Sequence, residues 1–234
     1  MLTLRPEILN TRPGDRVLDL GCGEGRHAIG LACLQAIELH AVDLSYRDLH
    51  TGRGKARELG EPVFSRVAFM NADGTRLPYC DNTFDAVICS EVLEHIPDYR
   101  TVIIELLRVL RPGGALVVSV PRWWPERVCW WLSDDYHANE GGHIRIFRHR
   151  ALQADIEQLG ARRFRRHWAH ALHSPYWWLQ CLFWRSRERN PLVRIYHRLL
   201  VWDMLSAPGL TRTLERWLNP VMGKSVVLYF EKQH

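Results

Sequence analysis

An apolar segment that runs directly into a glycine-rich turn limits the possible folds of this chain more than any other feature. Residues 17–25 read VLDLGCGEG, and a helical pattern starts at about Arg26. Glycine lets the backbone adopt a positive φ and pass close to a ligand, so this segment predicts a strand, a binding turn and a helix. Two other nucleotide motifs fit less well. A dinucleotide fingerprint would have its third glycine at position 26, and a phosphate-binding P-loop would need G-x-x-x-x-G-K.

Strand and helix patterns alternate through the first half of the chain. Helices are expected from about Arg26 and from Ser45, and a third, with apolar residues at helical spacing up to Leu110, is stopped by Pro112-Gly113-Gly114. Apolar runs predict strands over residues 16–20, 38–42, 67–71, 84–90 and 115–120. Such alternation with short loops indicates an α/β fold, in which helices cover both faces of a parallel sheet.

The second half is less regular and differs in chemistry. A helix over 151–159 and strands over 163–170 and 225–230 are expected there. Residues 1–120 carry 13 Lys and Arg against 16 Asp and Glu, whereas the remainder is basic and holds all ten tryptophans. The length of 234 residues favours a single domain over 1–234. Within it we expect a cofactor-binding core over 14–121 and insertions over 122–149 and 174–222.

The six cysteines and the amino-terminal residues indicate a cellular location. The cysteines form no C-x-x-C pair and no repeated spacing, so we expect reduced thiols and no metal. Residues 1–10 contain no apolar run like that of a secretory signal, and no later stretch approaches eighteen apolar residues. These observations predict a cytoplasmic protein.

Polar residues follow several of the predicted strands. Asp43 ends the second strand, Asn71-Ala72-Asp73 ends the third, and Ser90-Glu91 follows the fourth. Ligands of open α/β sheets bind outside the carboxyl ends of the strands. We therefore expect a binding site where these residues meet the glycine turn.

Four segments in this order resemble the motif series of class I S-adenosylmethionine-dependent methyltransferases, in particular the small-molecule group that includes quinone-biosynthesis enzymes. They are VLDLGCGEG, the AVD ending at Asp43, NADGTRLPYCDNTFDAVICSEVLEHI and RVLRPGGALVVSVP, and the similarity covers roughly residues 14–121. The resemblance implies a Rossmann-like sheet of seven strands whose last strand, over 225–230, runs antiparallel. It also implies an enzyme that uses S-adenosyl-L-methionine.

The resemblance further implies roles for particular residues. The glycine turn would pass under the methionine and ribose portions of the cofactor, and Asp43 would hold the ribose hydroxyls. Asp73 would face the adenine amino group, Ser90 would lie near the methionine moiety, and Asp19 would orient the glycine turn by bonding its backbone. The full set of expected cofactor-binding residues is Asp19, Gly21, Gly23, Gly25, Asp43, Leu44, Ala72, Asp73, Gly74 and Ser90.

Methyl transfer from a sulfonium is an in-line displacement, for which a protein chiefly supplies alignment and exclusion of water. An acidic acceptor also needs a base, and histidine is suited to that role near neutral pH. His143 and His137, in the first insertion, are the leading candidates because the substrate loop of the resembled family often lies there. His170 and His173, beyond the sixth strand, are weaker candidates.

The two aromatic-rich insertions are expected to form a lid over the substrate, because only sixteen residues precede Val17. Aromatic walls bind flat or lipid-like ligands. The predicted acceptor is therefore a hydrophobic small molecule such as a lipid, terpenoid, polyketide or aromatic compound. The expected lining residues are Trp123, Trp124, Trp130, Trp131, Tyr176, Trp177 and Trp178.

The basic and aromatic segment 174–198 leaves other functions open. It is compatible with peripheral contact at an anionic membrane and, less well, with nucleic acid, because lysines are few and no RNA-binding module is recognisable. One alternative is an RNA or protein methyltransferase that uses this basic half. Another is a protein that binds the cofactor without catalysis. The acceptor atom and the oligomeric state are not fixed by the sequence.

Overall fold

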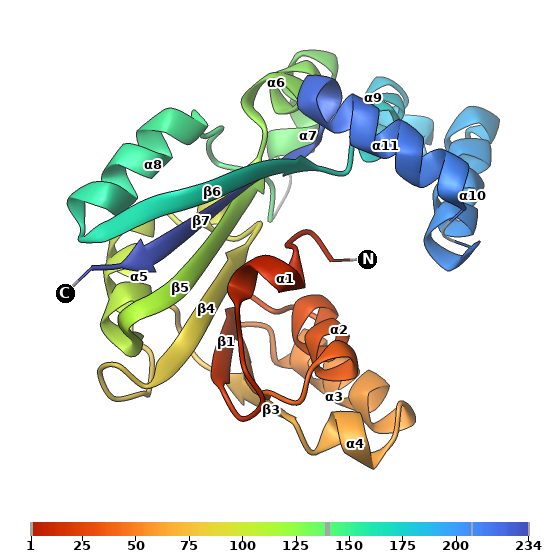
Figure 1. Cartoon of the computed structure of the whole chain (residues 1–234). Coiled ribbons are helices and arrows are strands. Elements are labelled where there is room, and N and C mark those ends of the chain that lie inside the picture. The colour runs from red at the N-terminus through yellow and green to blue at the C-terminus, as the bar shows by residue number, and fades with distance from the viewer. Residues whose placement is uncertain (1, 139–140, 207, 234) are drawn as a thin grey trace.

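A seven-stranded sheet forms the centre of the computed structural model, which describes residues 2–138, 141–206 and 208–233 (Figure 1). The strand order is β3-β2-β1-β4-β5-β7-β6, and β7 runs antiparallel to both neighbours while the other pairings are parallel. The predicted sheet with an antiparallel last strand is confirmed. The strands are β1 (Arg16–Leu20), β2 (Glu38–Asp43), β3 (Val67–Asn71), β4 (Phe84–Ser90), β5 (Leu110–Pro121), β6 (Ala161–Ala169) and β7 (Ser225–Lys232).

The expected and observed strands differ most in β5. The sequence predicts a strand from residue 115, but pairing with β4 already starts at Leu110, opposite Phe84. The register then shifts before Ala86 pairs with Ala115. Gly113, at φ +72°, provides the backbone freedom that this irregular segment needs.

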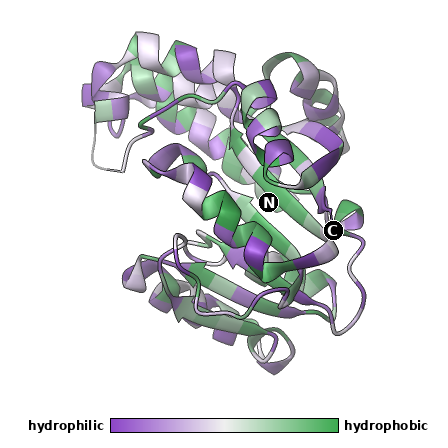
Figure 2. Ribbon diagram, turned by 90° about the vertical axis from the view of Figure 1, so that its left-hand side faces the viewer, coloured by the Kyte–Doolittle hydropathy of each residue, from purple (hydrophilic) through white to green (hydrophobic). Residues whose placement is uncertain are grey.

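Helices cover both faces of the sheet, as expected, because side chains alternate along each strand. Leu18 and Leu20 of β1 belong to the core beneath helices α5 and α8, whereas Val17 belongs to the core on the opposite face, beneath α2 and α3. Figure 2 shows the strands as the mainly apolar centre of the protein. The helices of the two layers are α1 (Pro6–Leu9), α2 (Arg26–Leu34), α3 (Tyr46–Glu58), α4 (Glu61–Phe64), α5 (Tyr99–Val109) and α8 (His149–Gln158).

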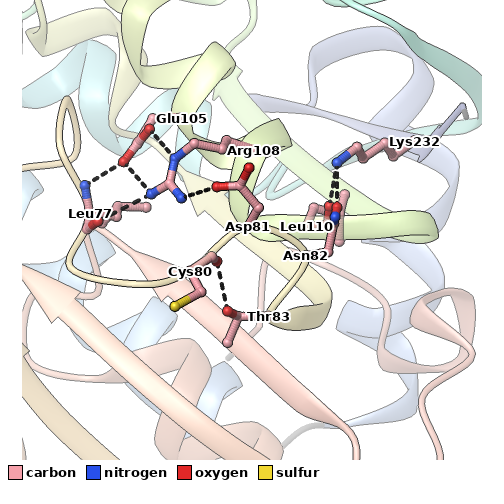
Figure 3. A network of polar contacts seen from close by, with 9 residues as sticks. All are labelled: Leu77, Cys80, Asp81, Asn82, Thr83, Glu105, Arg108, Leu110 and Lys232. Carbon is pink, nitrogen blue, oxygen red and sulfur yellow. Dashed lines mark hydrogen bonds and ion pairs between the residues drawn. The ribbon is translucent and has the colours of Figure 1, made fainter.

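A polar network holds the loop between β3 and β4 against α5 (Figure 3). Arg108 donates hydrogen bonds to Glu105 at 2.8 Å, to Asp81 at 2.6 Å and to the carbonyl of Leu77 at 3.2 Å. Glu105 in turn accepts from the backbone N–H of Leu77 at 2.7 Å. The network therefore fixes the course of the loop that begins with Ala72 and Asp73.

The two predicted insertions are more helical than the sequence indicated. Residues 122–149, expected to lack a clear period, contain α6 (Trp123–Leu132) and α7 (Asp134–Ala138). Residues 174–222 contain most of α9 (His173–Leu182), with η2 (Trp184–Ser186), α10 (Pro191–Ser206) and α11 (Gly209–Met222). Residues 139, 140 and 207 of these insertions lie outside the described residues.

Figure 1 shows these helices gathered beyond the end of the sheet where β5 ends and β7 begins. Their own small core joins α6, α7 and α9 through Cys129, Tyr136 and Cys181. No helix within the described residues is long and apolar enough to cross a membrane.

Candidate functional site

The glycine turn leaves β1 with three successive positive φ angles at alternate residues. Gly21, Gly23 and Gly25 have φ values of +69°, +52° and +81°. A Cβ at Gly21 would lie 2.2 Å from a methyl carbon of Val92, whereas a Cβ at Gly23 would meet no atom within 4 Å. The turn is therefore packed on one side and open at Gly23, as a backbone surface for a ligand must be.

Asp43, at the end of β2, lies directly against this turn. Its carboxylate accepts hydrogen bonds from the N–H of Gly23 at 2.7 Å and from the N–H of Ser45 at 2.8 Å. Each carboxylate oxygen has a second lone pair. Leu44 is exposed, and its carbonyl accepts a hydrogen bond from the Asn71 side chain at 2.8 Å. The ends of β2 and β3 are thus joined beside the turn.

The end of β3 continues this edge. The N–H of Ala72 donates to the carbonyl of Asp43 at 3.3 Å, which places the polar residues after β3 next to the end of β2. Asp73 is exposed, and its carboxylate caps the following turn by accepting from Thr75 N–H at 2.8 Å. Gly74 is buried, and a Cβ there would lie 2.9 Å from Leu20. Asp73 therefore presents its remaining lone pairs to the solvent side of the site.

Ser90 and Glu91 extend the polar edge to β4 and β5. The Ser90 hydroxyl lies 2.7 Å from the Ser119 hydroxyl of β5, and Ser119 donates to Glu91 at 3.0 Å. Glu91 has a φ of +58°, which is uncommon for a residue other than glycine. Strained backbone of this kind is frequent at functional sites.

Asp19 lies beneath the turn and is almost fully buried. One carboxylate oxygen accepts from the N–H of Ala28, in the first turn of α2, at 3.1 Å, and the other has no hydrogen-bond partner within the described residues. The bond is made to α2 rather than to one of the glycines. Burial raises the pKa of Asp19 to about 7.

Of the two leading candidates for the base, His137 lies in α7, and His143 lies between α7 and α8. His143 Nδ1 is 2.5 Å from the buried carboxylate of Glu126, and the His143 ring packs edge-on against that of His95. Burial opposes ionisation of Glu126, but the His143 hydrogen bond and charge outweigh it, so the pKa of Glu126 is lowered. His137 stacks on Trp130 with ring centres 4.3 Å apart. Neither histidine lines the cavity described next.

A cavity of about 410 Å³ opens beside the glycine turn. Arg26, which follows Gly25, and Glu91, which follows Ser90, line one side of it. His170 and His173, the weaker candidates from the sequence, also line it, at the end of β6 and the start of α9. The remaining side chains that form its walls include Tyr176, Trp177, His197, Leu200, Val201, Met204 and Lys224.

Burial keeps the two cavity histidines uncharged. Desolvation lowers the pKa of His173 to about 4, and it lowers the pKa of His170 well below its usual value. Lys224 lowers the pKa of both further. Both rings are therefore neutral near pH 7 and can donate or accept hydrogen bonds.

Of the seven aromatic residues expected at the acceptor site, Tyr176 and Trp177 line this cavity. The other five have different positions. Trp123 and Trp131 are exposed, Trp130 stacks on His137, and Trp124 and Trp178 donate to backbone carbonyls of α11 and α6. The sequence did not single out Arg26, His197 or Lys224, because nothing in the local pattern links them to the strand ends.

Two groups of side chains in the described residues bring metal-binding atoms within 4.8 Å of one another. One consists of Glu94, His95 and His143, and the other of His170, His173 and Glu215. The sequence led us to expect no metal, since its spacing pattern resembles no metal motif. Each group combines residues that are distant in sequence or belong to different elements. Only the fold therefore reveals these groups.

Comparison with known proteins finds a family match within the first half of the chain. Residues 18–118 match the family described as "Methyltransferase domain". The 27-O-demethylrifamycin SV methyltransferase of Amycolatopsis mediterranei is 40% identical over 112 residues, which are 48% of this chain and 40% of that protein. The demethylmenaquinone methyltransferase of Beutenbergia cavernae is 40% identical over 125 residues, 51% of this chain and 47% of that protein.

The chain thus matches less than half the length of these curated relatives. Among solved structures, the fold resembles a geranyl diphosphate methyltransferase in complex with SAM, with a TM-score of 0.66, 18% identity and coverage of 97% and 82% of the two chains. It also resembles the cyclase SpnF, with a TM-score of 0.65, 22% identity and coverage of 97% and 78%. The structural likeness therefore shows the fold alone. The sequence matches confirm the resemblance to class I methyltransferases over residues 18–118.

Proposed function

We propose that this chain, which carries the methyltransferase domain of class I S-adenosylmethionine-dependent enzymes over residues 18–118, transfers a methyl group from S-adenosyl-L-methionine to a hydrophobic small molecule. One observation carries the proposal. The open glycine turn, with the Asp43 carboxylate against it, lies at the same sheet edge as the aromatic cavity. Arg26 and Glu91 border both, so a donor and an acceptor would meet there.

The residues at the turn fit the cofactor that the family implies. Space at Gly23 admits a ligand next to the backbone, and Asp43 can accept ribose hydroxyls with its free lone pairs. Asp73, with Ala72 and Gly74 beside it, would bind the adenine amino group. Gly21, Gly25, Leu44 and Ser90 would complete the contacts, and Asp19 would hold α2 in place behind the turn. The bound cofactor would supply the electrophilic methyl group.

The cavity walls support an apolar acceptor. Trp177 and the α10 side chains Leu200, Val201 and Met204 provide a surface for hydrocarbon or aromatic groups. Fully burying one such side chain contributes roughly 1.5–3 kcal/mol. In this proposal the insertion 174–222 forms most of the lid, and 122–149 supports it through α6.

We predict that a histidine removes the proton from the acceptor, and several histidines are candidates for this role. His143 and His137 stay candidates, and the Glu126 hydrogen bond would leave His143 Nε2 free to accept a proton. His170, His173 and His197 are closer to the proposed acceptor because they line the cavity. A kcat that falls on replacement of a cavity histidine but not of His143 would assign the role to the cavity.

Two measurements test the function. S-adenosylmethionine should raise the melting temperature of the purified chain, because a ligand of the folded state stabilises it. Incubation with labelled cofactor and a lipid-soluble extract should give a labelled product heavier by one methylene group. No thermal shift and no labelled product from lipid-soluble, RNA or protein fractions would refute the proposal, whereas labelled RNA or protein would favour an acceptor of that class.

We also propose that the chain makes peripheral contact with a membrane, and the two helices α10 and α11 support this contact. Each exposes large apolar side chains at helical spacing, and the segment is rich in arginine, which suits an anionic bilayer. The apolar stripes are Leu192, Ile195, Leu199 and Trp202 on α10, and Leu210, Leu214, Trp217 and Val221 on α11.

Vesicle sedimentation tests this contact. Vesicles of phosphatidylcholine with phosphatidylglycerol should retain the chain more strongly than phosphatidylcholine alone. Trp217→Ser should weaken retention, whereas Leu34→Ser, at another exposed apolar side chain, which lies on α2, should not. Equal retention of both variants would exclude the α11 stripe as the contact.

A further inference from the structure

Three residues from separate elements meet beside the cavity, and the two histidines among them line it. His170 follows the last residue of β6, His173 begins α9, and Glu215 lies in the middle of α11. One metal-binding atom from each lies within 4.8 Å of the other two. The rings of His170 and His173 are 5.2 Å apart, so the two imidazoles face a common space.

The same three residues leave polar atoms buried without partners. His170 Nδ1, His173 Nδ1 and Glu215 Oε1 are inaccessible to solvent and make no hydrogen bond within the described residues. Buried polar atoms in native proteins are almost always hydrogen-bonded, so three such atoms in one place point to a missing ligand. The His170 side chain is itself 8% exposed and has a φ of +65°. The backbone thus holds its ring toward the cluster in an uncommon conformation.

Hydrogen bonding orients one ring of the cluster. His170 Nε2 lies 3.1 Å from the hydroxyl of Thr3, which leaves Nδ1 as the free nitrogen. An oriented imidazole of this kind, held through its other nitrogen, is the usual arrangement of a metal-binding histidine. Asp203, a buried residue of α10, is near enough to affect the pKa of both His173 and Glu215.

We propose that His170, His173 and Glu215 bind a divalent transition-metal ion of the zinc or manganese type. Two imidazoles and one carboxylate form a donor set that binds such ions and leaves a coordination position open. Both histidines line the cavity, so the proposed ion would lie beside it.

The role of the ion rests on the proposed function, whereas its binding does not. An ion at this wall would hold an oxygen atom of the acceptor, and metal coordination makes a bound hydroxyl more acidic. The site would then position the acceptor opposite the glycine turn. It would also fasten α9 and α11 to the end of β6, which joins both lid helices to the sheet.

Metal titration of the full chain tests the site without cofactor or acceptor. The chain is treated with a chelator, and Zn²⁺ is titrated by calorimetry while Co²⁺ is followed by its absorption bands. We expect one ion per chain and Co²⁺ bands that indicate nitrogen and oxygen ligands. Glu215→Gln, which keeps the shape of the side chain, should weaken binding at least tenfold.

The control variant is His95→Gln, which alters the other cluster and should leave binding unchanged. Wild-type affinity in Glu215→Gln, or loss of binding in His95→Gln, would overturn the proposal. Circular dichroism shows whether Glu215→Gln folds, and His173→Gln replaces it if it does not. Because these experiments omit S-adenosylmethionine, an absent metal site with a normal cofactor-induced thermal shift refutes this inference alone.

Discussion

Replacement of Gly23 by alanine tests whether the glycine turn is a ligand surface or only a tight bend. Gly23 has a φ of +52°, and an added Cβ would meet no atom within 4 Å. The substitution therefore introduces backbone strain but no clash with the protein. Gly14, in the turn before β1, is a matched control because it has a φ of +87° and equally open surroundings. The two variants differ mainly in whether the new methyl group projects into the proposed cofactor site.

An alanine in the left-handed region costs roughly 1–2 kcal/mol. For a chain of this size, both variants should therefore lose about 2–8 °C in melting temperature. Gly23→Ala should in addition bind S-adenosylmethionine at least tenfold more weakly by calorimetry, a difference of about 1.4 kcal/mol. Gly14→Ala should bind it as the wild type does. Equal affinity of the two variants would show that the cofactor does not pass over Gly23, and the placement of the ligand would be wrong.

Three other predictions follow from single side chains. Asp43→Ala removes the acceptor of two backbone hydrogen bonds and the proposed ribose contact, so calorimetry should show at least a tenfold loss of cofactor affinity; unchanged affinity would contradict the ribose assignment. Asp19 has a raised pKa of about 7, so the folded state keeps a proton that the unfolded state releases, and stability falls as pH rises from about 4 through 7. Asp19→Asn should remove this loss, which amounts to about 4 kcal/mol over the full range and about 2.5 kcal/mol between pH 5 and pH 8. If the free energy of unfolding from urea titration falls by the same amount between these two pH values in both proteins, the reasoning fails. Arg108→Ala should lower the free energy of unfolding by about 1–3 kcal/mol, whereas Arg111→Ala, at a more exposed single ion pair, should lower it by less than about 1 kcal/mol; similar losses in denaturant titration would contradict the importance of the network.

The first half of the fold could be predicted because local pattern and long-range packing agree there. The strand over 16–20 was predicted with its observed bounds, since an apolar run between a charged residue and a glycine turn has few other solutions. Helix α3 begins at the expected place because Ser45 accepts a hydrogen bond from the N–H of Asp48. The polar residues at the strand ends were predicted to meet, and the Asp43 hydrogen bond to Gly23 confirms that they do.

The second half could not be derived in the same way, because its contacts join residues that are distant in sequence. Trp124 and Trp178 look like ligand-binding aromatics in the sequence, but their indole N–H groups donate to backbone carbonyls of other helices. His143 was singled out for its place in the first insertion, yet its position depends on Glu126, seventeen residues away. Lys224 gave no local signal, and it borders the cavity only because β7 returns to the sheet between β5 and β6.

The difference in charge between the two halves has a consequence for the acceptor. The proposed cofactor site holds the carboxylates of Asp43 and Asp73, whereas Arg26 and Lys224 border the cavity beside it. Glu91 is the one carboxylate among the cavity-lining residues of the described chain. Positive charge near the acceptor stabilises an oxygen that has lost its proton, and such an oxygen is the better nucleophile. If the proposed function is correct, the basic half therefore favours an acceptor that reacts through oxygen. Lys224→Met should then shift the pH optimum of methyl transfer upward. The affinity for S-adenosylmethionine should stay the same.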